Sequence, residues 1–516
     1  MPRKLPLGLQ DFRKIREHDF LYVDKTEFIY SIAANPGAFF LSRPRRFGKS
    51  LTISTLKELF SGSRELFEGL WIADKWDWDK RHPVLRISFT AIGFHSLGLT
   101  VALNQELELI AKQQGIRLDA QGVSGRFREL IGAMAASGHR TVVLVDEYDA
   151  PIIQYLGKDL NQAKENREIL REFYAVLKDC DTEIELVFLT GVSKFSKTGI
   201  FSGINNLTDL TLHPDYAMVL GYSQEELESN FSEELSAAAE KLNLSHAALL
   251  EKLREWYNGY RFEENANTMY NPVSINNFLD QKKFDNFWFA TGTPTFLIQL
   301  LKEKGVFDLE AIGQSNLDFD SFDLEDIRLF GLLYQTGYLT IKSRDDFGQY
   351  TLDYPNLEVK NSMLAYLFEA FGGVSKGTGV SLAIKLERAF IADDLDQVFR
   401  ILQEIFAHVP YFLHERYPEK FFHAAIHLLF KYMGIKVHSE VTTSDGRADS
   451  MVETDSHIYI LEYKLDKSPR EALDQMRKKR YYRSVWESGK PITAIGVQFS
   501  SQTRNIEAWE VDSFYH

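Results

Sequence analysis

The first part of the chain alternates short apolar runs with stretches of helical spacing. Four continuous apolar runs predict strands, at 38–43 (AFFLSR), 83–89 (PVLRISF), 141–147 (TVVLVDE) and 184–192 (IELVFLTGV). Continuous rather than alternating apolar residues are typical of strands buried on both faces of a sheet. Strands that alternate with helices predict a parallel sheet flanked by helices, so residues 1–220 are expected to form an α/β domain.

From residue 221 the pattern becomes helical. Ser223 is a typical helix N-cap with acidic residues in the following turn, and helical spacing continues through 234–257. We therefore expect 221–324 to form a helical lid over the first domain. Within 325–370, a helix-like run, two strand-like segments and another helix follow in the order of a winged-helix module; a packing module that touches no DNA would have the same pattern.

A glycine-rich segment precedes the last part of the chain. Residues 371–381 (FGGVSKGTGVS) have the composition of a flexible connector, and amphipathic helices follow to about residue 409. The interpretation is a linker with helices at 371–410 and a separate α/β domain at 411–516. A chain of 516 residues is too long for one hydrophobic core, which agrees with an α/β multidomain protein.

Composition and charge narrow the class of protein. The net charge of −14 argues against a protein that coats nucleic acid indiscriminately, but 470–483 (REALDQMRKKRYYR) is locally basic. Any DNA or RNA contact is therefore expected at the C-terminal end, and among nucleic-acid partners we expect DNA more than RNA. No apolar run approaches the roughly 18 residues of a membrane helix, so we expect a cytoplasmic protein without membrane contact. The single Cys180 excludes an internal disulfide and agrees with a reducing compartment, so any metal is expected to be held by oxygen ligands.

Residues 43–50 (RPRRFGKS) lie between a predicted strand and a predicted helix, which is where a phosphate-binding loop must lie. Lys49 is expected to reach the β- and γ-phosphates, and Ser50 to bind Mg²⁺. Arg43 stands where the usual GxxxxGK[ST] pattern has its first glycine. The residues expected to bind the nucleotide here are Arg45, Arg46, Phe47, Gly48, Lys49, Ser50 and Leu51. Arg45 and Arg46 would neutralise phosphate, act on the nucleotide of a neighbouring protomer in a homo-oligomer, or pair with surface carboxylates.

A second element supports this interpretation. The strand 141–147 ends in Asp146 and Glu147, which are placed to hold the hydrated Mg²⁺ and to orient or deprotonate the attacking water. The alternative is a core strand with solvated acids at its end. Thr190, at the end of the next strand, would contact the γ-phosphate or simply cap the strand.

A separate group of polar residues lies near the C-terminus. Glu462 and Lys464 lie two residues apart on a predicted strand and therefore project to the same face. The turn at 452–456 folds the preceding strand back antiparallel and brings Asp449 beside Glu462. We expect both carboxylates to hold Mg²⁺, or Mn²⁺, and Lys464 to orient the attacking water. Glu419 and Gln475 are expected accessory residues.

Seven segments together resemble a known family. They are RPRRFGKSLTISTL, YVDKT (22–26), VVLVDEYDAP (142–151), LTGVSKFS (189–196), WYNGYRF (256–262), YNPVSI (270–275) and TGYLTIK (336–342). They resemble the bacterial AAA-ATPase-like family, often found with a C-terminal PD-(D/E)XK nuclease domain. The resemblance implies a P-loop fold of the additional-strand type, with Asp146 and Glu147 as the Walker B pair and Asp449, Glu462 and Lys464 as the nuclease motif.

The sequence leaves three functional hypotheses. The first is an enzyme in which ATP binding or hydrolysis controls a metal-dependent nuclease. The second is a signalling or assembly ATPase whose nuclease-like domain only binds nucleic acid or a partner, because an intact motif can persist in a binding module. The third is a nucleotide-binding switch with negligible hydrolysis. The base-contacting residues carry no readable preference for ATP over GTP.

Overall fold

The computed structural model describes residues 4–194, 200–201, 204, 206–289, 295–315, 327–372, 375–407, 426–431, 436–443 and 446–514. It forms two compact units: unit 1 comprises 1–296 and 309–360, and unit 2 comprises 297–308 and 361–516. Among the described helices, none is long and apolar enough to cross a membrane. The five-part division expected from the sequence stays a prediction.

A parallel sheet forms the centre of unit 1. Its strands are β1 (Gly37–Ser42), β2 (Val84–Ser88), β3 (Thr141–Asp146), β4 (Ile184–Gly191) and β5 (Leu207–Asp209). All four strands expected from the apolar runs are confirmed. The strand order is β2-β3-β4-β1-β5, so β4 lies between β1 and β3. The predicted α/β fold with an additional strand is therefore confirmed.

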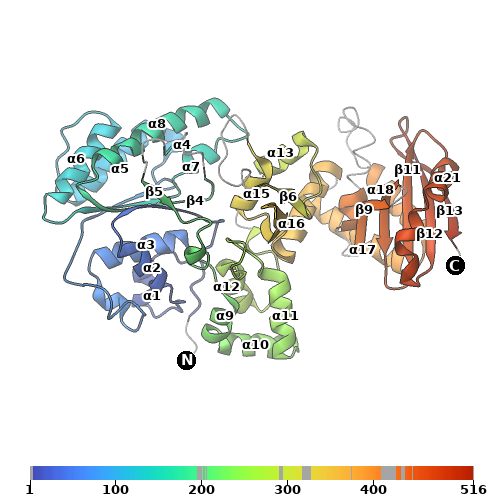
Figure 1. The fold of residues 1–516 in the computed structure, drawn as a ribbon, viewed down its shortest axis with the longest axis horizontal. Helices are drawn as coiled ribbons and strands as arrows, with labels where there is room; N and C mark the ends of the chain where they lie inside the picture. Colours follow the sequence, from blue (N-terminus) through green and yellow to red (C-terminus); the bar gives the residue numbers. More distant parts are fainter. Residues whose placement is uncertain are drawn as a thin grey trace. The chain divides into compact units, whose positions relative to one another are not determined.

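Helices cover both faces of this sheet. One face carries α1 (Phe12–Glu17), α2 (Thr26–Ala33) and α3 (Lys49–Phe60), and the other carries α5 (Leu99–Gln113), α6 (Val123–Ala135) and α8 (Leu160–Asp179) (Figure 1). The shorter elements are η1 (Arg64–Phe67), α4 (Phe94–Leu97), α7 (Ala150–Ile153) and η2 (Pro214–Tyr216). Since helices flank both faces, the central strands are buried on both, as their continuous apolar residues predicted.

The helical region after residue 221 has its own core. Its helices are α9 (Gln224–Asn230), α10 (Ser232–Leu242), α11 (His246–Tyr257) and α12 (Pro272–Gln281). The predicted cap at Ser223 is confirmed: its hydroxyl accepts from the Glu226 N–H, and the Glu226 carboxylate accepts from the Ser223 N–H. The buried side chains of these helices pack together with Leu21 and Val23 from the N-terminal segment. This contact joins the start of the chain to the helical region.

A small antiparallel sheet follows in unit 1. It has the order β6-β8-β7, from β6 (Ile312–Gln314), β7 (Thr340–Arg344) and β8 (Tyr350–Asp353). Helices α15 (Leu329–Thr336) and α16 (Leu357–Gly372) precede and follow the hairpin, and α13 (Thr295–Lys304) lies earlier in the chain. The predicted order of helix, two strands and helix is present, with β6 as an additional strand.

The expectation of a flexible connector over 371–381 is wrong for the part that the structure describes. Helix α16 extends to Gly372 and α17 (Lys376–Ile391) begins four residues later. The buried side chains of Leu382 and Leu386 anchor α17, which offsets the cost of glycine in its first turns. A Cβ at Gly379 would lie 2.7 Å from the Phe368 ring, so this glycine permits close packing of two helices rather than flexibility.

Unit 2 contains a five-stranded mixed sheet of order β13-β12-β11-β10-β9. Its elements are α18 (Leu395–Ala407), β9 (Lys436–Thr443), β10 (Gly446–Glu453), β11 (Ile458–Leu465), α21 (Pro469–Lys479), η4 (Tyr481–Ser488), β12 (Ile492–Ser500) and β13 (Asn505–Phe514). The predicted antiparallel hairpin is β10 with β11, while β11 and β12 are parallel and joined through α21. Ser468 caps α21 by accepting from the Glu471 N–H, and Leu473 and Met476 bury its apolar face. The separate α/β domain expected at the C-terminus is thus confirmed as a fold.

Candidate functional site

The nucleotide-loop sequence connects β1 to α3. Gly48 lies at the N-cap of α3 with a φ of 105°, in a region of backbone conformation that favours glycine. No side chain caps this helix, and its first turn contains no acidic residue. The N–H groups of the first turn therefore favour an anion, and this end of the helix borders a cavity of about 480 Å³.

Lys49 is buried at the base of the loop. Its Nζ donates to the backbone oxygens of Arg43 and Pro44, both at 2.8 Å. Burial lowers the pKa of Lys49 to about 8, against the opposing effect of nearby carboxylates, chiefly Glu147 and Asp146. The ammonium group is thus held inside the loop, where phosphate oxygens can replace the two carbonyl oxygens as acceptors.

The two acids expected at the end of β3 have different surroundings. Asp146 is 3% exposed, and its Oδ1 accepts from the Thr190 hydroxyl at 2.8 Å. Glu147 lines the cavity and has a φ of 53°. Burial raises the pKa of Glu147, while Lys49 and a hydrogen bond from Thr90 lower it. The arrangement suits Asp146 as a fixed ligand for hydrated Mg²⁺ and Glu147 as the base.

Each of the two acids has a hydroxyl partner: Thr190 donates to Asp146, and Thr90 donates to Glu147. Thr190 is fully buried and bonded to Asp146, which favours orientation of that carboxylate; its predicted contact with the γ-phosphate stays a prediction. Sequence reasoning missed Thr90, which lies two residues beyond β2. Since β2 pairs with β3 in parallel, a polar residue just after β2 was the available signal.

Arg43, which stands in place of the first glycine of the pattern, is buried and makes contacts that hold the loop in place. It is 1% exposed, and its guanidinium donates to the backbone oxygens of Thr211 at 2.8 Å and Tyr216 at 2.9 Å. The guanidinium carbon also lies 4.2 Å from the centroid of the Phe262 ring. Burial lowers the pKa of Arg43 to about 10. The side chain thus holds the loop against the segment after β5 and against the WYNGYRF motif.

The remaining residues of the loop differ in how far their side chains are exposed. Arg45 and Arg46 are exposed and line the cavity, where they can meet phosphate charge. Ser50 and Leu51 line it as well. Phe47 is 1% exposed, and its ring packs edge-on against Tyr260 at 4.8 Å. Its contribution to the nucleotide site is therefore mainly through packing of the loop.

The other shared motifs meet the outer side of this loop. The backbone oxygen of Arg45 accepts from the Trp288 indole at 3.0 Å and from the Asn271 amide at 3.5 Å. A Cβ at Gly337 would lie 2.7 Å from the Cβ of Pro44, so only glycine allows the loop to approach there. These contacts hold the backbone of the nucleotide loop on the side away from the cavity.

Glu358 connects two of the contacting segments. It is fully buried at the start of α16, and its carboxylate accepts from the Ser274 hydroxyl at 2.6 Å and the Trp288 N–H at 2.5 Å. Burial raises the pKa of Glu358 to about 7, against these hydrogen bonds, which lower it. The carboxylate therefore ties α12, Trp288 and α16 together behind the loop.

The second candidate site lies on the β10–β11 hairpin of unit 2. The last paired residues are Ser450 and Leu461, and the next step of this antiparallel register places Asp449 opposite Glu462. The Asp449 carboxylate accepts from the Tyr463 N–H at 2.8 Å. The structure therefore brings the two carboxylates together, as the turn and the strand alternation predicted.

Glu462 is 2% exposed and has two different carboxylate oxygens. Its Oε1 accepts from the Lys464 ammonium at 2.9 Å and from the Gln475 amide. Its Oε2 is buried and has no hydrogen-bond partner among the described residues. Burial raises the pKa of Glu462 to about 7, the Asp449 charge adds to this effect, and Lys464 opposes it. A buried carboxylate oxygen without a donor fits a cation ligand, and a second carboxylate beside it suits Mg²⁺ or Mn²⁺.

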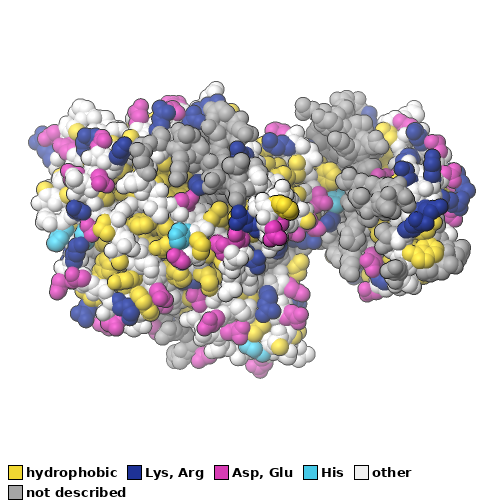
Figure 2. Space-filling view, viewed as in Figure 1, with side chains coloured by type: hydrophobic (Ala, Val, Ile, Leu, Met, Phe, Trp, Pro, Cys, Tyr) yellow, Lys and Arg dark blue, Asp and Glu magenta, His cyan; other side chains and the backbone are white. Residues whose placement is uncertain are grey.

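The surroundings of the second site are basic. Arg477, Lys478, Lys479 and Arg480 are exposed at the end of α21, and Figure 2 shows Lys and Arg side chains gathered over this helix. Gln475 on the same helix contacts Glu462, so the basic residues follow directly after a site residue. Glu419, the other expected accessory residue, lies outside the described residues.

Comparison with known proteins matches both parts of the chain. A family model described as "Predicted AAA-ATPase" matches residues 6–201, and one described as "PD-(D/E)XK nuclease superfamily" matches residues 417–509. Similar solved structures include the ORC1 protein of Aeropyrum pernix in complex with DNA (12% identity, 66% of this chain and 91% of that chain, TM-score 0.25). Another is CDC6P of Pyrobaculum aerophilum (11% identity, 67% of this chain and 92% of that chain, TM-score 0.27). The fold assignment rests on strand order, because these scores are too low to support it.

A curated relative covers the whole chain. It is the "Uncharacterized protein in vnfD 5'region" of Azotobacter chroococcum mcd 1, which is 38% identical over 99% of each chain. The family match at the N-terminus coincides with the sheet that carries the nucleotide loop, and the match at the C-terminus coincides with the hairpin of Asp449 and Glu462. The chain therefore belongs to the AAA-ATPase-like family and carries a C-terminal domain of the PD-(D/E)XK nuclease superfamily.

Proposed function

We propose that this protein binds and hydrolyses ATP in unit 1 and cleaves phosphodiester bonds of nucleic acid in unit 2, with a divalent metal ion at each site. One observation carries the proposal: each unit holds a buried or half-buried lysine next to a pair of carboxylates. These are Lys49 with Asp146 and Glu147, and Lys464 with Asp449 and Glu462. A cation beside paired carboxylates is suited to phosphate chemistry at a metal site.

In unit 1, the chain's own groups suit phosphoryl transfer to water. Lys49 and the first turn of α3 bind the phosphates, and Ser50 and Asp146 are the residues that would hold Mg²⁺. Bound Mg²⁺ would neutralise charge on the phosphate oxygens. Glu147 orients the attacking water and accepts its proton, and burial helps because it raises the pKa of this base.

In unit 2, Asp449 and Glu462 would hold the metal ion, which would polarise the scissile phosphate. Lys464 orients the attacking water and stabilises charge on the phosphate. Lys464 and Gln475 both engage Oε1 of Glu462, so Oε2 is the oxygen that would hold the ion. The basic end of α21 supports contact with the phosphate backbone, and DNA is the substrate we expect.

The test is cleavage of single- and double-stranded DNA and RNA by the full chain, with Mg²⁺ or Mn²⁺ and with or without ATP. We expect metal-dependent cleavage that falls about 100-fold in Lys464→Ala. Lys385→Ala, on the exposed face of α17, is the matched control. Lys49→Ala should abolish ATP turnover and any effect of ATP on cleavage.

The experiment also separates the rival hypotheses. If no nucleic acid is cut and Lys464→Ala changes nothing, the nuclease proposal is wrong, and nucleic-acid binding by unit 2 with intact ATP turnover would favour a signalling or assembly ATPase. Nucleotide-dependent oligomerisation that persists in Asp449→Ala would also favour a signalling or assembly ATPase. Absence of ATP turnover with retained ATP binding would favour a nucleotide switch.

A further inference from the structure

Glu147, the proposed base, has a backbone conformation that its neighbours must maintain. Its φ of 53° lies in the left-handed region, which is unfavourable for a residue with a side chain and persists only where the surrounding structure holds it. Asp146 ends β3, so the turn of the backbone at Glu147 sets the direction of a side chain that lines the cavity. The contacts of the next two residues therefore control the position of the base.

These two residues are bound to the segment that follows β4. The Tyr148 N–H donates to the backbone oxygen of Thr190 at 2.9 Å, and the Tyr148 hydroxyl donates to that of Ser193 at 2.9 Å. Asp149 accepts from the Ser193 N–H at 2.8 Å and from the Ser193 hydroxyl at 2.7 Å. The same Asp149 oxygen accepts from the Val192 N–H at 3.1 Å. The segment after β4 therefore holds the backbone that follows the base.

Asp149 borders the cavity, but its carboxylate is engaged in these contacts. It is 1% exposed, and three donors share its Oδ2. Its Oδ1 lies against Gly191, where an added Cβ would come within 2.8 Å. The carboxylate thus suits a positioning role, in which it joins the backbone after Glu147 to the end of β4.

The segment after β4 continues to a helix of the small-sheet module, which consists of α15, β6, β7 and β8. The Lys194 N–H donates to Oε1 of Gln335 at 2.9 Å, across 141 positions of the chain. Gln335 is 5% exposed and belongs to α15. We infer that residues 190–194 are a connection through which α15 sets the position of Glu147 and thereby the rate of ATP hydrolysis. This inference rests on the proposed ATPase and adds a point of control outside the nucleotide cavity.

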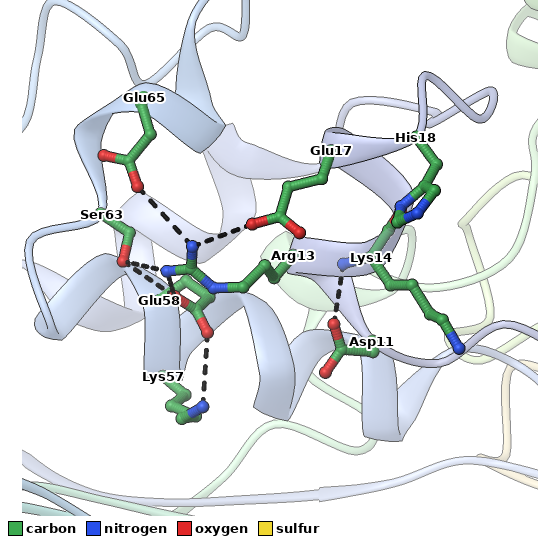
Figure 3. A network of polar contacts seen from close by, with 9 residues as sticks. All are labelled: Asp11, Arg13, Lys14, Glu17, His18, Lys57, Glu58, Ser63 and Glu65. Carbon is green, nitrogen blue, oxygen red and sulfur yellow. Dashed lines mark hydrogen bonds and ion pairs between the residues drawn. The ribbon is translucent and has the colours of Figure 1, made fainter.

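The phosphate-binding helix α3 is held by different contacts. Arg13 of α1 donates to Glu58, in the last turn of α3, at 2.6 Å and to Ser63 at 2.9 Å, as Figure 3 shows. The Phe12 N–H donates to the Ser54 hydroxyl at 2.9 Å, which also joins α1 to α3. Since these contacts do not involve the segment after β4, loss of the connection should slow ATP hydrolysis and leave ATP binding largely unchanged.

The first experiment measures ATP turnover and ATP binding of the full chain with Gln335→Leu. Leucine is similar in size but cannot accept from the Lys194 N–H. We expect kcat to fall about tenfold, while KM and the equilibrium affinity for ATP stay within about twofold of the wild type. Gln349→Leu, at an exposed residue of the same module, is the matched control and should keep the wild-type kcat.

The same substitution in the Glu147→Gln background separates positioning of the base from a general structural loss. If Gln335 acts through Glu147, the residual turnover should change by less than about twofold there, because the base is already absent. A tenfold fall in both backgrounds would show that Gln335 does not act through the base, and the inference would be wrong.

Ser193→Ala tests the other end of the connection with a milder change. It removes the hydroxyl donor of Asp149 and keeps both backbone donors. We expect kcat to fall about threefold, again only where Glu147 is present. A wild-type kcat in both Ser193→Ala and Gln335→Leu, with turnover that still depends on Glu147, would overturn the inference and leave the proposed ATPase standing. Absence of ATP turnover in the wild type would overturn both.

Discussion

The indole Nε1 of Trp288 donates to the backbone oxygen of Arg45 at 3.0 Å, inside the nucleotide loop. Arg45 presents its side chain to the cavity, while its carbonyl group is held from behind. The backbone N–H of Trp288 in turn donates to the carboxylate of the buried Glu358. The backbone of the nucleotide loop is therefore held by a hydrogen bond from outside the loop. A glycine-rich loop, in contrast, depends on its own turns.

This contact predicts the effect of Trp288→Phe. The substitution keeps most of the aromatic packing and removes the indole donor, so the Arg45 carbonyl loses a partner at about 1 kcal/mol. We expect ATP affinity to fall roughly fivefold and the melting temperature to fall by a few degrees. Calorimetric titration with ATP measures the first effect and thermal unfolding the second. Trp71→Phe, at a residue that is 37% exposed, is the control; unchanged affinity in Trp288→Phe would show that the contact does not shape the loop.

The second prediction concerns Arg43→Gly, which restores the glycine of the usual pattern. Despite the better match, we expect the variant to be less stable by about 2–4 kcal/mol, because the backbone oxygens of Thr211 and Tyr216 lose their donor and Phe262 loses the guanidinium. ATP affinity should fall as well. Urea unfolding of the variant is compared with that of Arg117→Gly, whose native side chain is 89% exposed. A variant as stable as the wild type would contradict the structural role of Arg43.

The third prediction concerns Glu147→Gln. The amide cannot accept the proton of the attacking water, so ATP turnover should fall about 100-fold or more. Binding should persist, because Lys49 and the first turn of α3 are unchanged. Turnover and equilibrium binding are measured side by side, with Glu165→Gln on the exposed face of α8 as control. Turnover within about twofold of the wild type would rule out Glu147 as the base.

The fourth prediction is a pH dependence of stability through Glu358. Its pKa is raised from 4.5 to about 7, so the folded protein binds this proton more tightly than the unfolded chain. The associated stability is fully present below about pH 4.5 and is lost as the pH rises through about 7, by at most about 3 kcal/mol.

Glu358→Gln tests this pH dependence because the neutral amide can still accept from the Trp288 N–H. Unfolding free energies of the wild type and the variant are compared at several values between pH 5 and pH 8. The decline should be smaller in Glu358→Gln and unchanged in Glu251→Gln, an exposed residue of α11. Parallel curves for all three proteins would contradict the raised pKa.

Several features followed from the sequence because they depend on neighbouring residues. The strand before Lys49 and the helix after it place the lysine at a strand-to-helix turn. Glu462 and Lys464 share a face because side chains alternate along a strand. The cap at Ser223 is likewise a local motif, and the structure contains it.

The tertiary structure decided the partners of these residues. Arg45 and Trp288 are 243 positions apart, and Asn271 is 226 positions from Arg45, so no local pattern links them. Arg43 stands where the usual pattern has a glycine because its side chain contacts Thr211 and Phe262. These two residues lie near Arg43 only in the folded chain.

The glycines at 371–381 also show that local composition does not determine tertiary packing. Their composition indicated a connector, but at Gly379 the glycine makes room for the Phe368 ring. Local backbone preferences and side-chain alternation depend on only a few adjacent residues. The nucleotide loop and the β10–β11 hairpin were predictable for this reason. Burial and long-range hydrogen bonding depend on which distant segments meet, and only the folded chain decides that.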